Sequence, residues 1–266
     1  MSSKHRFATE EIEKFSTLDL ISELKRRYQV LSRPERSCVI LGAPNSGVSS
    51  EAGFLRKEWG LCSIKREDFL PKDDTDLNVG LNKLSEEISS FRCRRGFAIQ
   101  HFPQSSSEAA LLDQMISAKH EKRKDYKVIL LTMPHETDEE RVESGKTLTS
   151  RATGHLVHQP SGRCYNSNVS ELAPQTANVD DITGEPLVCP KNDLSGLAYR
   201  IKTWWQTQEP SIASYYGSRA QKVDAAKSRD QVSKDVSRIL LTTTCAMSGL
   251  SGDRTETPIS ILQDRE

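Results

Sequence analysis

The sequence predicts an α/β fold in which a parallel sheet is flanked by helices. The first observation is an apolar run at Ser37–Leu41 that leads directly into the stretch GAPNSGVSS, Gly42–Ser50. Helical stretches separate it from two further apolar runs, Gly96–Ile99 and Lys127–Leu131. Strands that are apolar on both faces are typical of parallel sheets. Finally, residues 150–192 break this rhythm with many Gly, Pro, Asn, Asp and Ser residues, which indicates an irregular insertion.

Composition narrows the classes of function. A chain of 266 residues can form one large α/β domain or two small ones with an ample core. Lys and Arg number 37 and Asp and Glu also number 37, so no bulk field attracts nucleic acid or an anionic membrane. No apolar run approaches a membrane span, and the mixed charges of the first residues fit neither a signal peptide nor a transit peptide. Protein or small-molecule partners are therefore favoured.

The cysteines are scattered, and none lies in a C-x-x-C pair. In an intracellular protein such cysteines are expected to be reduced thiols rather than zinc ligands or a disulfide framework. The sequence therefore predicts neither a metal site nor disulfides. The cysteines are Cys38, Cys62, Cys93, Cys164, Cys189 and Cys245.

The remaining elements follow in chain order. Residues 11–30 carry an amphipathic helical pattern, which Pro34 closes. The glycine-containing stretch opens a helix through Glu51–Trp59, and this order of strand, loop and helix is the one that a phosphate-binding loop requires. Further helices are expected at about 193–208, 210–217 and 229–240.

Two stretches of the irregular insertion carry a family resemblance. GHLVHQPSGRCYN (Gly154–Asn166) and VDDITGEPL (Val179–Leu187) resemble the two halves of the lid of a long-type adenylate kinase. The stretches STLDLISELKRRY, RRGFAIQHFPQ and SIASYY agree, and the similarity covers roughly residues 16–240. The resemblance implies a P-loop kinase-like sheet, a small β-rich lid over ATP, and a flap that closes over AMP.

The resemblance also implies domain boundaries. Between Asp68 and Gly96 there is room for one helix, about Asp76–Ser90, where the family places three, so the NMP-binding flap is expected to be truncated. The predicted parts are an N-terminal extension and helix (1–36), a core with this reduced flap (37–150), the lid (151–190), C-terminal core helices and a strand (191–240), and an extended tail (241–266).

The glycine loop departs from the family pattern G-x-P-G-x-G-K-G-T. Gly42 and Gly47 are kept, but Asn45 and Ser49 stand at two glycine positions and Val48 replaces the lysine. That lysine neutralises charge on the transferred phosphoryl group, which is the main task in this reaction, and valine cannot do so. Ser50 keeps a hydroxyl at the family's threonine position. The favoured interpretation is therefore a loop that only connects the strand to the helix, and the alternative is a degenerate nucleotide-binding loop in which Ser50 contacts magnesium.

The AMP side has changed as well. Pro71 stands where the family has an AMP-binding arginine, and Gln104 replaces the arginine of the G-F-P-R motif. Gln100 replaces an aspartate that helps to organise magnesium and water. Glu108 falls at the position of the AMP-recognising glutamine, where its charge would oppose a phosphate.

The lid keeps only part of its arginine set. Arg151 matches the family arginine that packs on adenine, and Arg163 is also present. His155, Pro190 and Ile201 stand at three other arginine positions of the family. Because arginine forks onto phosphate oxygens, these losses remove much of the phosphate clamp. Residues that match the structural hydrogen-bond cluster of the lid are nevertheless kept: His158, Ser161, Asp181 and Thr183.

Three hypotheses follow. The favoured one is a non-catalytic adenylate-kinase-like protein that serves as a structural or docking subunit of a larger assembly. The alternatives are a degenerate regulatory protein that still binds ATP, and a nucleoside monophosphate kinase with residual activity. No catalytic residue and no cofactor other than ATP are expected. The candidate nucleotide-binding residues are Gly42, Gly47, Ser49, Ser50, Arg151 and Arg163.

Partners and location are predicted only broadly. We expect other protein subunits as partners, with no nucleic acid and no membrane span. Long-type adenylate kinases occur in mitochondria without a cleaved presequence, in the cytosol, and in cilia or flagella. An intracellular location is therefore expected, with the mitochondrion favoured over the cytoplasm and over a cilium or flagellum.

Overall fold

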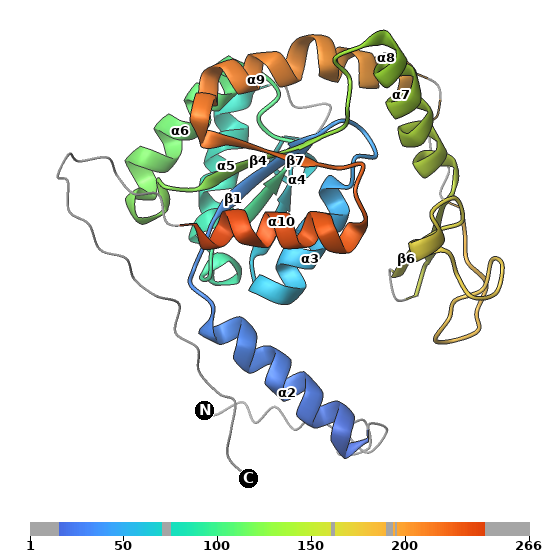
Figure 1. The fold of residues 1–266 in the computed structure, drawn as a ribbon. Helices are drawn as coiled ribbons and strands as arrows, with labels where there is room; N and C mark the ends of the chain where they lie inside the picture. Colours follow the sequence, from blue (N-terminus) through green and yellow to red (C-terminus); the bar gives the residue numbers. More distant parts are fainter. Residues whose placement is uncertain (1–15, 71–75, 161–162, 190–193, 195, 243–266) are drawn as a thin grey trace, which may run out of the picture.

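The computed structural model describes residues 16–70, 76–160, 163–189, 194 and 196–242, and they contain an α/β core (Figure 1). A five-stranded parallel sheet has the order β2-β3-β1-β4-β7. This confirms the predicted fold class. The strands are β1 (Cys38–Gly42), β2 (Cys62–Lys65), β3 (Phe97–Gln100), β4 (Lys127–Thr132) and β7 (Ala220–Asp224).

The three inner strands are those that the apolar runs predict. Every residue of β1 and β3 is buried, and in β4 only Thr132 is partly exposed. In the edge strand β2 buried residues alternate with more exposed ones, and in β7 only Val223 is buried. Strand β2 therefore carries no continuous apolar run that would reveal it in the sequence.

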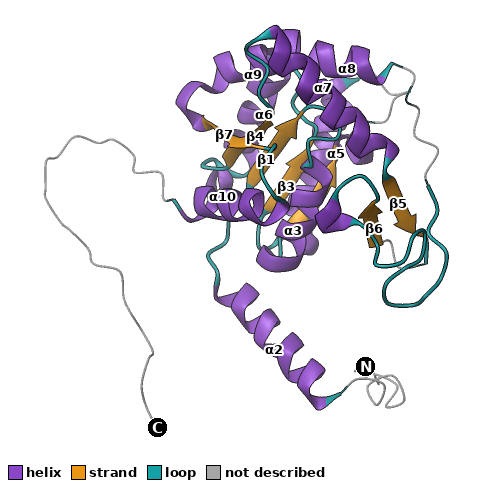
Figure 2. Ribbon diagram, turned by 45° about the vertical axis from the view of Figure 1, so that its right-hand side comes forward, coloured by secondary structure: helices purple, strands orange, loops and turns teal. Residues whose placement is uncertain are grey.

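Helices cover both faces of the sheet. Helices α3 and α10 lie on one face, and α5, α6 and α9 lie on the other (Figures 1 and 2). A short π-helix, Trp204–Gln208, joins α8 to α9. The α-helices are α2 (Thr17–Ser32), α3 (Val48–Trp59), α4 (Arg66–Phe69), α5 (Leu77–Ser89), α6 (Ser106–Lys119), α7 (Asp138–Thr153), α8 (Leu197–Thr203), α9 (Glu209–Tyr216) and α10 (Arg229–Leu241). No helix of the described ranges has the length and apolar character needed to cross a membrane.

Among the described residues between Asp68 and Gly96, α5 is the one helix that is longer than a single turn. Residues 71–75 lie outside the described residues. Its start is fixed by Asp76, whose carboxylate accepts from the amides of Asn78 and Val79. The predicted single helix is therefore present.

Helix α2 projects away from the core, as Figures 1 and 2 show. Ser16 and Asp19 form a capping box at its start, which fixes the first turn. The predicted amphipathic pattern is present, but the structure contains no buried residue in this helix. Leu18 is 76% exposed, Leu24 66% and Tyr28 74%. The described part of the chain therefore leaves its apolar face uncovered.

The lid contains a small antiparallel pair, β5 (His155–His158) and β6 (Arg163–Asn166). The second half of the lid joins it through a bridge between Val157 and Val188. Arg151 precedes this pair on the last turn of α7.

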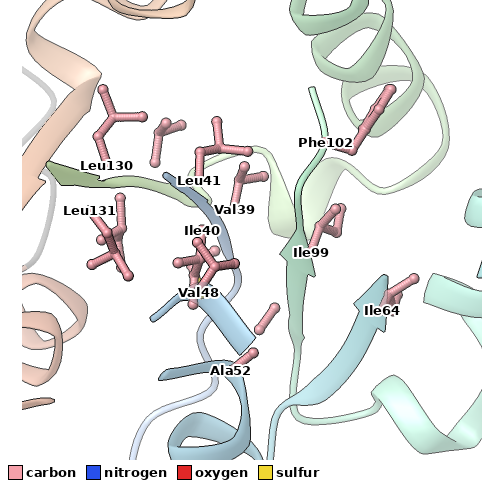
Figure 3. Packing of buried hydrophobic residues seen from close by; sticks show 14 of the residues in the cluster. Val39, Ile40, Leu41, Val48, Ala52, Ile64, Ile99, Phe102, Leu130 and Leu131 are labelled. Carbon is pink, nitrogen blue, oxygen red and sulfur yellow. The ribbon is translucent and has the colours of Figure 1, made fainter. Parts of the chain in front are cut away.

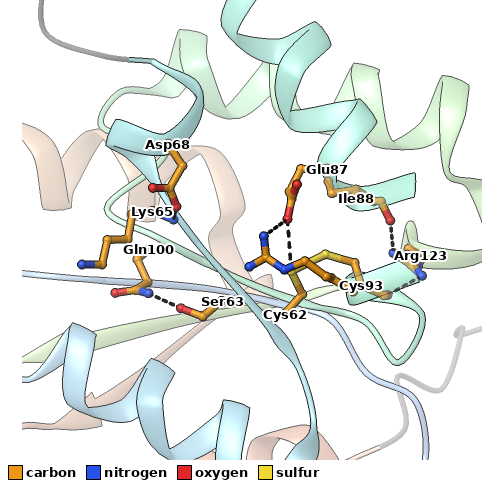
Figure 4. Close-up of a disulfide and its surroundings, with 10 residues drawn as sticks. Cys62, Ser63, Lys65, Asp68, Glu87, Ile88, Cys93, Gln100 and Arg123 are labelled. Atoms are coloured by element: carbon orange, nitrogen blue, oxygen red, sulfur yellow. Dashed lines mark hydrogen bonds and ion pairs between the residues drawn. A yellow bond between two sulfur atoms is a disulfide. The ribbon is translucent and has the colours of Figure 1, made fainter. Parts of the chain in front are cut away.

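The prediction of reduced cysteines is wrong for one pair. Cys62 on β2 and Cys93 after α5 form a disulfide, with their Cα atoms 4.8 Å apart (Figure 4). They are separated by 31 positions in the chain, and they meet because Cys62 pairs with the start of β3 just after Cys93. Spacing alone does not reveal this. Cys38 is a buried free thiol.

Candidate functional site

The loop after β1 turns through left-handed backbone conformations with fewer glycines than the family pattern. Gly42 is required because a Cβ there would lie 2.9 Å from the carbonyl oxygen of Leu131. Gly47 has φ 107°, a left-handed value that favours glycine. Asn45 also has a positive φ, 65°, and asparagine tolerates this region, which explains how the family glycine is replaced without reshaping the turn.

Val48 is part of the hydrophobic core. It is the first residue of α3, it is 2% exposed, and it belongs to the same buried cluster as Ile40 and Ala52 (Figure 3). The next two residues, Ser49 and Ser50, are exposed in the first turn of the helix. The loop therefore offers backbone amides, two hydroxyls and the positive end of a helix dipole to an anion, but no ammonium group.

A cavity of about 760 Å³ opens beside this loop. The predicted residues Gly47, Ser49, Ser50 and Arg151 line it together, and the start of the lid contributes His155. Gly42 lies just beneath, at the end of β1. The volume falls within the range of small-molecule sites.

Arg151 is held in the cavity wall. Its guanidinium donates to the carbonyl oxygen of Ala225 at 2.9 Å, and burial lowers the pKa of Arg151. Three further basic residues line the cavity and were not predicted from the sequence: Arg200, Lys227 and Arg229.

These three residues could have been found by two signals. Ile201, at a family arginine position, is buried, whereas Arg200 directly before it lines the cavity. The basic character is thus shifted by one position. Lys227 and Arg229 follow β7, and ligands of open α/β sheets bind beyond the carboxyl ends of the strands.

Two titratable residues of the cavity wall do not belong to any sequence motif that would have identified them. Glu51 is 2% exposed, and its two carboxylate oxygens lie 3.1 and 3.0 Å from the hydroxyl of Ser233. Burial raises the pKa of Glu51 to about 7. His101, which follows β3, has φ 59°, and burial lowers its pKa.

The lid cluster has a different centre from the predicted one. Asp180 is 1% exposed, and it accepts hydrogen bonds from Tyr165 at 3.0 Å and from the hydroxyl of Thr183 at 2.9 Å. His158, also predicted, is buried and lies 2.7 Å from the carboxylate of Glu185. The predicted Asp181 is exposed, and it accepts from the backbone amide of Gln175.

Asp180 takes this place because the chain turns directly after it. Its carboxylate accepts the backbone amides of Ile182 and Thr183, so it closes the turn from within, and Asp181 points outward. Glu185 and Tyr165 complete the cluster and were missed. Ser161, Pro71 and Pro190 lie outside the described residues, and only the backbone of Arg163 is described, as part of β6.

The AMP side is occupied by an internal ion pair. Arg66 donates to both carboxylate oxygens of Glu108, at 3.0 and 3.1 Å. The same carboxylate accepts the backbone amide of Gln104 at 2.7 Å, and the guanidinium lies 5.4 Å from the ring centre of Phe102. The charge of Glu108 is thus matched by Arg66, a residue that had not been given a role.

Gln100 is likewise paired within the protein. It is 2% exposed, and its amide nitrogen donates to the hydroxyl of Ser63 at 2.6 Å (Figure 4). An amide is neutral, so this position lacks the charge that attracts a magnesium ion.

Comparison with known proteins agrees with this geometry. No protein-family model matches the chain. The chain is 27% identical to adenylate kinase 4 of Arabidopsis thaliana over 256 residues, which cover 88% of this chain and 98% of that protein. It is 30% identical to adenylate kinase of Lodderomyces elongisporus over 249 residues, which cover 83% of this chain and 93% of that protein. The chain therefore belongs to the adenylate kinase family.

Proposed function

We propose that this protein is a non-catalytic member of the adenylate kinase family that binds ATP in the cavity beside the glycine loop. The observation that carries the proposal is the contrast at this cavity: the space and the surrounding cations are kept, while the lysine position of the loop holds the buried Val48.

Support for nucleotide binding comes from the lining of the cavity. The N-terminus of α3 and the loop amides favour phosphate oxygens. Arg151, Arg200 and Arg229 line the same space, and guanidinium groups form paired hydrogen bonds with phosphate. An apolar floor of Ala43, Val48 and Leu197 is available to a base or ribose.

Support for the loss of transfer comes from the second substrate's side. Transfer between two nucleotides requires both to be held in line, since catalysis of phosphoryl transfer is mostly positioning and charge stabilisation. Glu108 is neutralised by Arg66 and turned onto the backbone of Gln104. A phosphate would have to break this pair before it gained an arginine contact.

Binding and transfer are tested separately. Titration calorimetry should detect the heat of ATP binding to the wild-type protein, and saturating ATP should raise the melting temperature of the protein. Arg151→Ala should weaken binding by about tenfold, the effect of losing roughly one charge-assisted hydrogen bond. Arg141→Ala is the matched control, because Arg141 lies on the same helix but is half exposed and pairs with Asp138. Absence of binding, or an equal effect of both variants, would reject the proposed site.

A second candidate function is docking within a larger assembly, which the exposed face of α2 favours. Leu24 and Tyr28 are 66% and 74% exposed, although both are large and apolar in character. A soluble helix usually buries such a face. The amount of partner protein that co-purifies with the tagged protein should fall in Leu24→Glu, while the melting temperature stays unchanged. Lys25→Glu serves as the control on the polar face of the helix. A truncation at Thr242 tests whether residues 243–266 contribute. Equal recovery from all variants would reject docking through these segments.

The mitochondrion remains our proposed location. A fluorescent fusion at the C-terminus, compared with a matrix marker and an intermembrane-space marker, tests it. Signal confined to the cytosol or to a cilium would replace this proposal with one of the two alternatives.

A further inference from the structure

On the side of the sheet away from the cavity wall, a second cluster of reactive side chains lies at the edge strand β2. Cys62 and Cys93 are 5% and 0% exposed. The carboxylate of Glu87 on α5 lies 3.8 Å from the sulfur of Cys62 (Figure 4). One ligand atom from each of these three residues lies within 4.8 Å of the other two.

We infer that Cys62, Cys93 and Glu87 form a redox-controlled site for a thiophilic divalent cation such as Zn²⁺. In the oxidised state the two cysteines are joined as a disulfide and cannot bind a metal. In the reduced state two thiolates and one carboxylate face a common point, with water as the fourth ligand. Two sulfur ligands and one oxygen ligand suit zinc and not magnesium or calcium.

The backbone holds the two cysteines together without their sulfur–sulfur bond. The amide of Cys62 donates to the carbonyl of Gly96 at 3.0 Å, and the amide of Gly96 donates to the carbonyl of Cys93 at 2.8 Å. Arg123 also donates to the carbonyl of Cys93, at 2.7 Å, and to that of Ile88. Reduction therefore leaves the two thiols on backbone segments that remain next to each other.

Charges around the cluster fit a bound cation with anionic ligands. The guanidinium of Arg123 donates to the backbone carbonyl of Cys93, so one positive charge is already held next to the backbone of a ligand residue. Arg92 pairs with Glu87 at 2.8 Å and is 72% exposed, so it can swing aside or balance the net charge of the occupied site. The side chain of Glu87 is 33% exposed, which gives an ion a path from solvent.

The two steps balance chemically. An external dithiol reduces the disulfide: it gives two electrons and two protons to the Cys62 and Cys93 sulfurs and is itself oxidised to a disulfide. The cation then displaces the two thiol protons and forms two metal–sulfur bonds, so binding releases protons. Oxidation of the pair by an external disulfide reverses both steps and releases the ion.

The test uses cobalt, whose thiolate complexes absorb in the near ultraviolet. The protein carries Cys164→Ser, Cys189→Ser and Cys245→Ser, is reduced with a phosphine under nitrogen, and is titrated with Co²⁺ alone. We expect one Co²⁺ per chain with a sulfur-to-metal charge-transfer band, displacement by Zn²⁺, and no binding after oxidation with diamide. Peptide mapping without reductant should join Cys62 to Cys93 in the oxidised sample.

Two variants separate the ligands from the scaffold. Glu87→Gln keeps the size of a partly exposed side chain and should weaken Co²⁺ affinity at least tenfold, whereas Arg92→Ala should retain full binding. No binding to the reduced protein, or binding unchanged by oxidation, would overturn the site. Binding that oxidation abolishes but Glu87→Gln leaves unchanged would overturn the three-ligand assignment. Circular dichroism of each variant checks that the fold is retained.

Discussion

The nucleotide side, beside the glycine loop, and the AMP side, around Arg66 and Glu108, depart from the family pattern in different ways. On the nucleotide side the glycine loop keeps its left-handed turns, and basic residues surround an open cavity of about 760 Å³. On the AMP side the polar residues bond to each other: Arg66 with Glu108, and Gln100 with Ser63. One side keeps room for a ligand, and on the other these side chains bond to one another, although the buried side-chain oxygen of Gln100 has no hydrogen-bond partner.

This difference follows from the cost of unpaired charge. A carboxylate removed from water must gain a partner, and Glu108 sits in a partly buried place where no substrate phosphate could serve as one. Arg66 supplies that partner and leaves the site stable without a ligand. The serine hydroxyls and exposed cations of the other side need no such compensation, because they are already hydrated. The folded protein can therefore keep this pocket without a bound substrate.

The largest expected effect concerns turnover. In a coupled assay that follows ADP formation from ATP and AMP, the rate should be at least about a thousandfold below that of an active adenylate kinase, because Val48 stands at the lysine position of the loop and Gln104 at an arginine position of the AMP side. Adenylate kinase of Lodderomyces elongisporus, prepared in the same way, is the positive control. Turnover within tenfold of that control would show that the protein is catalytic and would contradict the proposed difference between the two sides.

The second prediction concerns the ion pair of the AMP side. Arg66→Ala and Glu108→Ala should each lower the free energy of unfolding by about 3 kcal/mol, since each leaves a partly buried charge without its partner. The double variant should lose less than the sum, which urea denaturation of all four proteins measures as a coupling energy. Additive losses would mean that the two side chains stabilise the fold independently, and the AMP side would not be internally paired.

The sequence predicts the inner half of this molecule well. Strands β1, β3 and β4 carry continuous apolar runs because neighbours cover both of their faces. Strand β2 shares its faces with solvent and was not located. The glycine loop and Arg151, which the sequence singles out, both line the cavity, and the loop could be located because its motif is local in the sequence.

The features that escaped prediction depend on residues far apart in the chain. The pairing of Arg66 with Glu108 joins positions 42 apart, and that of Glu51 with Ser233 joins positions 182 apart. Neither pair leaves a periodic signal. For Asp180 and Asp181 the limit is orientation: two adjacent aspartates look alike in a sequence, and only the turn decides which one is buried.

The third prediction uses pH on the nucleotide side. Burial raises the pKa of Glu51 to about 7 from its ordinary value of 4.5, so the folded state favours the neutral acid. The stability that this acid contributes is complete below pH 4.5 and is lost as the pH rises through 7. Glu51→Gln should therefore raise the free energy of unfolding by about 2 kcal/mol at pH 8 and leave it nearly unchanged at pH 4.

Melting curves at the two pH values measure this difference. The amide keeps a hydrogen-bonding partner for the hydroxyl of Ser233, so packing is preserved. Glu58→Gln is the control, since that residue lies on the same helix but does not line the cavity. An equal gain at both pH values would mean that the gain comes from packing and not from ionisation.

The smallest expected effect tests whether the loop still faces phosphate. Val48 lines the cavity although it is 2% exposed, so a lysine there can bury its methylene groups and place its ammonium group in the cavity. Val48→Lys should then bind ATP about tenfold more tightly, which corresponds to about 1.4 kcal/mol. It should not restore turnover, because the Arg66–Glu108 pair still occupies the other side. Val48→Met controls for side-chain length without charge. If both variants bind ATP alike, the restored charge does not meet the phosphates, and the nucleotide side has lost its alignment as fully as the AMP side.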